Sequence, residues 1–296
     1  MQKIISIAGV YCVMMPAIAC TCGSLAGGGY YGILPQFHKN AAGLRWFHRS
    51  FETVALDESE IVSTETFTTL ELWGRYYPVN RLQLLAFVPF NFSKREEGDT
   101  ERKHGFGDAS FSANYTLFNT SDHCEKKWRH LFLAGAGIKL PTGKYRIGDS
   151  KGMVNPYLQP GTGSVDFTFS SIYSVQYKKL GVQADAEYRI NTKNKSDFKF
   201  GNRINSSLKL FYWQNAGKVS MLPNAGINWL SAAPDEEYGN VLTHTGGNEL
   251  LATFGLDVYL WRFTCGFTYR HPAYQNIAGG GVTTRNQWLL NAAYLF

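Results

Sequence analysis

Apolar and polar residues alternate with a period of two along most of this chain. The last segment is the clearest case, with Trp288, Leu290 and Tyr294 on one face and Gln287 and Asn291 on the other. Side chains of a β-strand point alternately to opposite faces, so this period predicts strands. After residue 22, no segment places apolar residues at helical spacing over three turns. The chain is therefore expected to be all-β.

Charged residues recur on the polar face of these segments. In 180–191, Asp185, Glu187 and Arg189 oppose Ala184 and Tyr188. Charges on one face of strand after strand do not suit the core of a soluble β-sandwich, whereas they suit the wet interior of a barrel whose outer face meets lipid. The sequence beyond the N-terminus has no run of about 18 apolar residues, so it offers no membrane-spanning helix. The mean hydropathy of -0.22 agrees with a barrel, because only every second residue has to face lipid.

Twelve segments show the alternation, an even number as single-chain bacterial barrels require. Short turns between them alternate with long polar stretches at 94–104, 142–161, 232–247 and 272–282, which we expect to be external loops. The fold class is thus a transmembrane antiparallel β-barrel of about 12 strands. The expected strands are 43–56, 64–77, 81–93, 105–118, 128–141, 162–177, 180–192, 199–213, 217–231, 248–260, 262–271 and 283–296.

The N-terminus has the features of an export signal. Lys3 precedes an apolar stretch, 4–15, that is too short to span a bilayer, and Ala17-Ile18-Ala19 supplies the small residues of a cleavage site. Cleavage would leave Cys20 first, and the same residues also form a loose lipobox, so simple cleavage and acylation of Cys20 are both open. The expected organisation is a signal peptide (1–19), an N-terminal periplasmic tether or plug (20–42) and a barrel (43–296) in the outer membrane of a Gram-negative bacterium.

Charges of both signs fall at the inward positions of the expected strands. They either pair as a structural network or form a selectivity surface, and the sequence leaves both alternatives open. A 12-strand barrel lies between eight-strand barrels, which side chains fill, and 16-strand porins, which hold a channel, so a narrow pore or ligand slot fits its size. The candidate lumen residues are Arg45, Arg49, Glu71, Arg75, Asp108, Asp166, Asp185, Glu187, Arg189, Arg203, Asp257, Arg262, Arg270 and Arg285.

Tyrosine and tryptophan gather near the expected short turns. Because these side chains prefer the membrane interface, they predict an aromatic girdle at that end of the barrel. General β-propensity is the alternative explanation. The residues concerned are Trp73, Tyr76, Tyr77, Tyr177, Tyr212, Trp213, Tyr259 and Trp261.

Two motifs flank the second long loop: Gly135-Ala-Gly-Ile-Lys-Leu-Pro-Thr-Gly-Lys144 and Leu158-Gln-Pro-Gly-Thr-Gly-Ser-Val-Asp166. Together they resemble outer-membrane transporter-like barrels of the phenol meta-degradation type, distant relatives of the fatty-acid channels. The segments 31–37, 72–78, 81–89 and 255–259 are similar to transporter-type barrels of Bacteroidota. The resemblance covers residues 30–296 and implies transport of small molecules, hydrophobic ones among them. No catalytic residues come with it.

The segment before the first strand has a glycine linker at 27–29 and then an apolar patch. In the fatty-acid channels, an N-terminal segment enters the barrel as a hatch. By analogy, this patch would occupy the periplasmic mouth, with a disordered tether as the alternative. The candidate plug residues are Tyr30, Tyr31, Leu34, Pro35 and Phe37.

Motifs for catalysis do not form. Gly143-Lys144 lacks the upstream glycine and the hydroxyl residue of a phosphate loop, and no nucleophile elbow or zinc-protease motif occurs. An outer-rim phospholipase would need Ser206 or Ser207 with His244, but Ser206 is expected to face lipid. We therefore expect no enzyme activity, metal or cofactor. The net charge of +6 is scattered over strands and loops, which argues against a nucleic-acid partner.

The sequence thus predicts a passive outer-membrane channel for small, hydrophobic or aromatic solutes. Gating by the N-terminal segment or by loops 142–161 and 232–247 is expected. The alternative is a closed structural or partner-binding barrel. Expected partners are outer-membrane lipid and lipopolysaccharide, a small-molecule solute, and the barrel-assembly machinery, which would read the terminal Phe296.

Overall fold

The computed structural model describes residues 39–54, 61–120, 127–148, 152 and 154–296. In these ranges, twelve antiparallel wall strands form a barrel, which confirms the expected class and strand number. Nine are continuous: β1 (Ala41–Val54), β2 (Ile61–Val79), β3 (Leu82–Glu97), β6 (Trp128–Lys139), β7 (Asp166–Tyr177), β8 (Leu180–Ile190), β12 (Val219–Ala232), β15 (Gly247–Leu260) and β16 (Phe263–Ile277). Three are interrupted: β4 (Asp99–Phe106) with β5 (Ser110–Asn119), β10 (Arg203–Tyr212) with β11 (Gln214–Ala216), and β17 (Val282–Thr284) with β18 (Gln287–Leu295).

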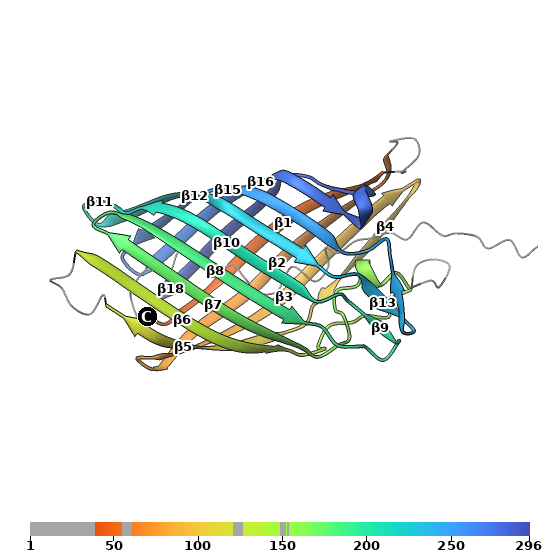
Figure 1. Cartoon of the computed structure of the whole chain (residues 1–296), viewed down its shortest axis with the longest axis horizontal. Helices are drawn as coiled ribbons and strands as arrows, with labels where there is room; N and C mark the ends of the chain where they lie inside the picture. Colours follow the sequence, from red (N-terminus) through yellow and green to blue (C-terminus); the bar gives the residue numbers. More distant parts are fainter. Residues whose placement is uncertain (1–38, 55–60, 121–126, 149–151, 153) are drawn as a thin grey trace, which may run out of the picture.

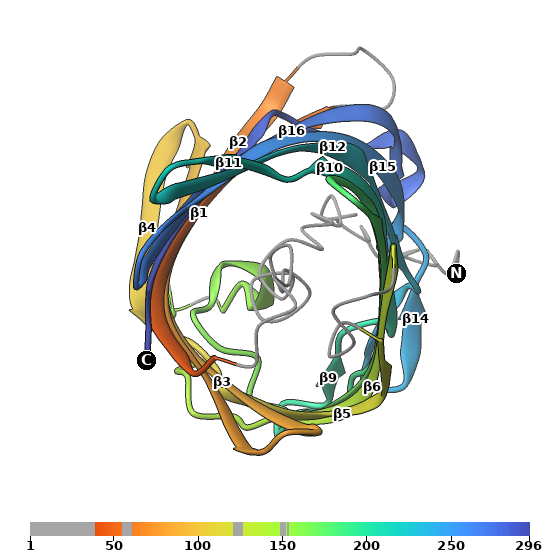
Figure 2. The same ribbon diagram turned by 90° about the vertical axis from the view of Figure 1, so that its left-hand side faces the viewer.

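The barrel closes where its first and last wall strands pair. β1 is bonded to β2 on one side and to β17 and β18 on the other, with Ala41 opposite Leu295 and Phe51 opposite Thr284. Figures 1 and 2 show the tilted strands as one ring around an interior. Closure lets the strands satisfy one another's backbone groups in a bilayer, where water cannot do so.

The two faces of the wall differ as the alternation predicts. Along β3, buried and more exposed side chains alternate over nearly the whole strand. On β2, the outward Leu72 is 56% exposed, whereas its inward neighbour Glu71 is 2% exposed. An exposed apolar belt around a buried polar interior reverses the order of a soluble protein. This arrangement is that of a transmembrane barrel.

Most connections at one end of the barrel, which we call the turn end, are short turns, whereas the longest connections lie at the other end, which we call the loop end (Figure 1). The C-terminus lies at the turn end. Two turns there are tight enough to hold Lys178 and Trp261 at a φ of 54°, a conformation typical of the two-residue turns of hairpins.

Two of the expected external loops are strands instead. The stretch 94–104 continues β3 and β4 as a hairpin, with Gly98 at a φ of 69° in its turn, and β16 extends to Ile277. Around Gly98 both faces of the hairpin are exposed. Because strand ends that meet water on both sides are polar on both faces, their composition does not distinguish them from loops.

The described residues of the β6–β7 connection, 140–148, 152 and 154–165, fold into the barrel. Figure 2, a view from the turn end, shows them inside the ring of strands. They contain the 3-10 helix η1 (Pro156–Leu158), which begins where the side chain of Asn155 accepts a hydrogen bond from Tyr157 N at 3.0 Å. We call these described residues the infolded segment.

Smaller elements complete the loop end. The strands β9 (Phe198–Lys199), β13 (Asp235–Glu237) and β14 (Asn240–Leu242) form a separate small sheet there, and the 3-10 helix η2 (Ala278–Gly280) follows β16. None of the helices in the described ranges is long and apolar enough to cross a membrane.

Candidate functional site

Charged side chains from distant parts of the wall interact inside the barrel. Arg45 and Glu71 face each other on β1 and β2, with a nitrogen–oxygen distance of 2.9 Å. Arg189 on β8 bonds to Glu187 at 3.0 Å and is also close enough to Glu71 to interact with it electrostatically. Since β2 and β8 are separated by several strands around the ring, this network crosses the lumen.

A second group of charges lies on β1, β10, β15 and β16. The ammonium group of Lys209 interacts with the carboxylate of Asp257. Glu249 interacts with two guanidinium groups, those of Arg49 and Arg270. Removal of one partner from such a buried group leaves an uncompensated charge, which is why these residues depend on one another.

The wall made of β3, β5, β6 and β7 presents uncharged side chains at the same levels. Leu131, Leu133 and Ile172 form a buried apolar cluster, and the Asn114 amide donates a hydrogen bond to Gln83 at 3.0 Å. At these levels, the interior is therefore charged on one side of its circumference and uncharged on the other. A neutral solute that passes along the uncharged side does not have to displace the charge pairs on the charged side. Nearer the loop end, Lys139 and Asp166 bring charges to this second side as well.

Guanidinium groups stack on aromatic rings inside the barrel. The Arg45 Cζ lies 5.8 Å from the ring centre of Trp73 and 5.6 Å from that of Phe87. Cations above ring faces are attracted by the ring quadrupole, so these pairs hold the arginine side chains in place. The interior thus combines charges with aromatic surface.

A buried polar cluster, which we call the clamp, joins the two ends of the infolded segment to the wall. The Lys139 ammonium lies 3.1 Å from Asp108 and 2.5 Å from Asp166, and it also contacts Thr162. Asp108 accepts hydrogen bonds from Gly143 N at 3.0 Å and from Thr162 N at 2.8 Å. Residues on both flanks of the segment are therefore fixed to one carboxylate.

The clamp needs glycine where backbones meet. A Cβ on Gly161 would lie 2.7 Å from the Gly143 Cα, and one on Gly143 would lie 2.8 Å from the Gly107 carbonyl carbon. Three chain segments thus approach more closely than side chains would permit. These glycines belong to the break between β4 and β5 and to the two sequence motifs quoted above.

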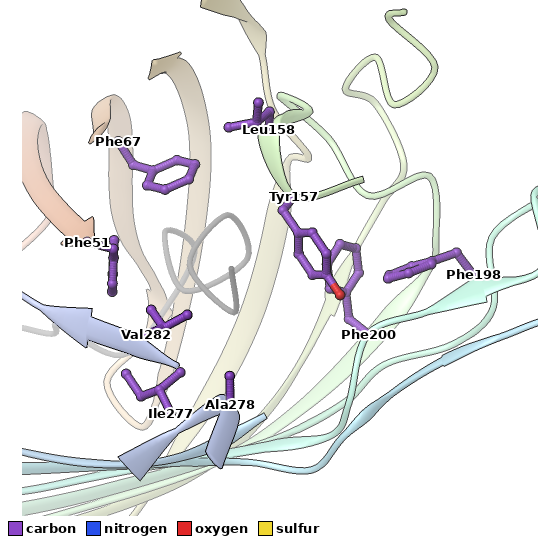
Figure 3. Close-up of a cluster of buried hydrophobic side chains, with 9 residues drawn as sticks. All are labelled: Phe51, Phe67, Tyr157, Leu158, Phe198, Phe200, Ile277, Ala278 and Val282. Atoms are coloured by element: carbon purple, nitrogen blue, oxygen red, sulfur yellow. The ribbon is translucent and has the colours of Figure 1, made fainter. Parts of the chain in front are cut away.

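At the loop end, the tip of the infolded segment packs into an apolar cluster that we call the mouth cluster (Figure 3). Tyr157 and Leu158 come from η1, and the remaining members come from the wall and the loop-end elements. Leu158 is 1% exposed. The cluster consists of Phe51, Phe67, Tyr157, Leu158, Phe198, Phe200, Ile277, Ala278 and Val282.

Asp235 supplies a buried carboxylate beside this cluster. One oxygen accepts a hydrogen bond from Gly201 N at 2.7 Å, and the other accepts one from the Tyr157 hydroxyl at 3.0 Å. Burial raises the pKa of the Asp235 carboxyl, although the nearby Arg203 charge and these hydrogen bonds oppose the rise. The hydrogen bond from Tyr157 to Asp235 therefore connects the tip of the infolded segment to β13.

Twelve of the fourteen candidate lumen residues lie inside the barrel or at its buried loop-end rim, and Arg262 and Arg285 do not. Arg262 lies in the β15–β16 turn, stacked on Trp261 with its guanidinium 3.1 Å from the Tyr294 hydroxyl. Arg285 follows β17, where the register with β1 gains one residue before β18 begins. The extra residue turns Arg285 outward, where it pairs with Glu52 at 2.6 Å.

The girdle prediction is wrong for half of its residues. Trp73, Tyr77, Trp213 and Tyr259 point inward: Trp73 donates a hydrogen bond to Asn291 at 3.0 Å, and Trp213 stacks on Tyr259 at 5.9 Å. Neighbours in a strand point to opposite faces, so pairs such as 76 and 77 cannot both face lipid. The outward residues are Tyr76, Tyr177, Tyr212 and Trp261.

Several predictions fall outside the described residues. These concern the signal peptide, the acylation of Cys20 and the plug residues from Tyr30 to Phe37. In the described ranges, no group of three or more histidine, cysteine or carboxylate side chains is placed to hold a metal ion.

Sequence reasoning missed the roles of Lys139, Tyr157 and Asp235. Lys139 was visible only as part of a motif, because a lysine at a strand end resembles any polar loop residue. Tyr157 and Asp235 are 78 residues apart, and no local pattern predicts their contact. Lys209 and Glu249 sit at inward positions by the same alternation that selected the other charges.

Comparison with known proteins gives a family and a fold. The model of the family "Putative MetA-pathway of phenol degradation" matches residues 56–260. An outer-membrane channel of Pseudomonas putida F1 is 15% identical, with a TM-score of 0.64 over 91% of this chain and 99% of that one. The β domain of the Bordetella autotransporter BrkA is 11% identical, with a TM-score of 0.54 over 87% and 100%. No curated protein matches the sequence.

Proposed function

The chain belongs to this family of the MetA pathway of phenol degradation, and on that premise we propose that it is a passive channel for small hydrophobic or aromatic solutes. It acts in the outer membrane of a Gram-negative bacterium, with the loop end outside and the turn end in the periplasm. This orientation follows the usual asymmetry of such barrels, in which periplasmic turns are short and external loops are long.

The observation that carries the proposal is the mouth cluster at the entrance to a polar interior. Rings from β1, β2, η1, β9 and the residue Phe200 after β9 meet there, and Tyr157 and Leu158 of the infolded segment pack among them. When the tip of the infolded segment is displaced, an aromatic solute that enters from outside meets the aromatic rings of this cluster first. Burial of about 100 Å² of apolar area stabilises such a contact by roughly 2.5 kcal/mol.

The infolded segment is the proposed gate. Its base is fixed by the clamp, and its tip is held by apolar packing and by the bond from Tyr157 to Asp235. Movement of the tip alone would open the mouth while the base stays attached to the wall. The N-terminal segment 20–42, with its apolar residues from Tyr30 to Phe37, is proposed as a second obstruction at the periplasmic end.

The charged residues of the interior are proposed to tune which solutes pass. Arg45, Glu71 and Arg189 interact across the lumen, so an ion must compete with existing pairs. A neutral aromatic molecule can follow the uncharged wall near Leu133 and Ile172. The channel would then favour neutral aromatic solutes over small ions.

The remaining proposals concern processing and partners. A signal peptide of residues 1–19 is removed, and Cys20 is either a free or an acylated N-terminus. The barrel contacts outer-membrane lipid and lipopolysaccharide, and Phe296 at the end of the last strand is read by the assembly machinery. No enzymatic role is proposed.

A closed barrel that binds a partner is the second candidate, because charges interact across the interior and the mouth is filled. Single-channel conductance in planar bilayers separates the two. The refolded mature protein is compared with variants that lack 23–42 or that carry a short glycine-serine linker in place of 146–158. Heat-modifiable mobility on a gel checks that each variant is folded.

Discrete conductance that rises in the deletion variants supports the channel. Silence in every correctly folded variant would contradict the channel and favour the closed barrel.

A further inference from the structure

The side chain of Tyr157 is a phenol group, and at the loop end it packs against Phe198, Phe200 and Asp235. We call the space that these three residues leave for the Tyr157 ring its pocket. The Tyr157 ring lies edge-on to Phe198 at 5.8 Å and to Phe200 at 6.0 Å, with interplanar angles of 87° and 76°. Its hydroxyl donates a hydrogen bond to Asp235 at 3.0 Å. Figure 3 shows the Tyr157 ring beside Phe198 and Phe200.

The acceptor at the bottom of this pocket is fixed without help from Tyr157. Asp235 is completely buried, its second carboxylate oxygen is held by Gly201 N at 2.7 Å, and its own N–H donates to the Thr245 hydroxyl at 2.7 Å. The Arg203 guanidinium, which stacks on Phe200 at 5.7 Å, supplies a balancing positive charge. A buried carboxylate with one oxygen directed at a ring substituent is a specific acceptor for a hydroxyl group.

The pocket and its occupant come from different parts of the chain. Phe198, Phe200 and Asp235 belong to β9, its flanking residues and β13, and the two phenylalanine rings pack on each other at 4.9 Å. Tyr157 arrives on the infolded segment. Withdrawal of the segment would therefore leave the aromatic walls and the carboxylate in place.

We propose that this pocket is a binding site for phenolic solutes, that Tyr157 occupies it in the closed channel, and that a free phenol opens the mouth by taking its place. The inference rests on the proposed channel function and names the solute class that the mouth recognises. No covalent step is involved. The ligand only has to bind the state in which Tyr157 is withdrawn, because that preference alone shifts the population towards it.

The chemistry of the pocket defines which ligands compete. Phenol and 4-methylphenol reproduce the ring and the hydroxyl donor of tyrosine. Toluene and 4-methylanisole fill the ring space without a donor, and benzoate would bring a second negative charge to Asp235. Because Tyr157 is tethered, it competes at an effective concentration on the order of millimolar, so free phenols should act in that range.

The first test removes the tethered competitor. Tyr157→Ala deletes a group with the shape of phenol, and cavities made in this way bind ligands that match the lost group. Calorimetry of the full-length variant in detergent should show phenol binding about tenfold or more tighter than benzene, since one hydrogen bond to a carboxylate distinguishes them. Adding Asp235→Asn should reduce that preference severalfold.

The second test uses the channel itself and does not depend on the alanine variant folding. Millimolar phenol should raise the open probability of the wild-type channel, whereas equal toluene should not. Tyr157→Phe lacks the hydroxyl, so it should respond at a several-fold lower phenol concentration. Heat-modifiable mobility confirms folding in each case.

The outcomes separate this inference from the proposed function. Equal affinity of phenol and benzene for Tyr157→Ala, or equal effects of phenol and toluene on the wild type, would overturn the phenol site and leave the channel standing. Selective phenol binding by a barrel that never conducts would support the site and overturn the channel.

Discussion

At its base, the infolded segment is fixed by charges, whereas at its tip it is fixed by rings and a hydrogen bond. In the clamp, Lys139 bridges Asp108 and Asp166, and all three side chains are buried. In the mouth cluster, Leu158 and Tyr157 pack against apolar surface that a solute could cover equally well. Separating a buried ion pair leaves bare charges, but exchanging one apolar contact for another leaves little change. We therefore expect the base to stay attached to the wall, whereas the tip can exchange its apolar contacts with a solute.

Loss of the clamp lysine should have the largest effect. Lys139→Met leaves Asp108 and Asp166 buried without their cation, and breaking such a pair costs about 3–5 kcal/mol. We expect the free energy of local opening to fall by that amount, measured as the rate of trypsin cleavage after Arg146. That guanidinium is bonded to Ser196 and to the Lys195 carbonyl, each at 2.9 Å, in the closed segment.

Lys127→Met is the matched control, because Lys127 is exposed at the turn end. Its cleavage rate should equal that of the wild type. If Lys139→Met is cleaved no faster than Lys127→Met, the base is not the stronger attachment and the comparison fails.

Truncation at the tip should have the next largest effect and should leave the base intact. Leu158 is buried in the mouth cluster, and Leu→Ala substitutions in such places cost about 2–5 kcal/mol. Leu158→Ala should therefore raise the open probability in planar bilayers, while hydrogen exchange of the Gly143 and Thr162 amides stays slow. Fast exchange of these two amides would mean that base and tip move together.

Removal of one hydroxyl should have a smaller effect. Tyr157→Phe keeps the ring but leaves Asp235 without one of its donors, which costs about 1.5–3 kcal/mol for a hydrogen bond to a charged group. Open probability should rise less than in Leu158→Ala. Asp235→Asn tests the same bond from its other side, and an unchanged open probability in both variants would show that the bond does not hold the tip.

Acid should close the mouth slightly. Burial raises the pKa of Asp235 in the closed state, whereas a withdrawn tip exposes the carboxyl and returns it to its ordinary value near 3.9. The closed state therefore binds a proton more tightly, so it gains stability as the pH falls through the raised pKa and stops gaining below the ordinary one. Open probability should fall on acidification, and Asp235→Asn should lose this part of the pH dependence. A rise in open probability on acidification would contradict the assignment of the raised pKa to the closed state.

The smallest effect is expected at the surface. Arg285 pairs with Glu52, but its side chain is 57% exposed. Exposed ion pairs contribute little, so Arg285→Ala should leave conductance and cleavage rate within error of the wild type. A clear change in conductance would contradict the outward placement of Arg285 and indicate that its side chain lies in the lumen.

The wall could be predicted from the sequence because a single physical constraint acts at every second residue. Leu72 and Glu71 differ in environment only because neighbouring residues of a strand point to opposite faces, and this alternation, which we call parity, can be read from the local sequence. The prediction was wrong where parity is broken. One inserted residue before β18 moved Arg285 outside, and a turn removed Arg262 from the strand.

The contents of the barrel could not be predicted in the same way. Asp108 and Asp166 were selected as lumen charges. Asp166 lies opposite Lys139 in the register of β6 and β7. The bonds of Asp108 to Gly143 and Thr162, however, form only after the infolded segment turns inward. The contact of Tyr157 with Asp235 depends on that turn as well. Such contacts are set by tertiary packing, which leaves no periodic trace in the sequence.

The pairing of β1 with β18 has a consequence for the order of assembly. Trp46 pairs with Leu290 across nearly the whole chain, whereas Asp108 meets Gly143 and Thr162 at separations of 35 and 54 residues. The entropy lost in closing a loop rises with its length, so the clamp should form before the ring is sealed. We therefore expect the infolded segment to be attached while the wall is still an open sheet, so that the wall strands close around it.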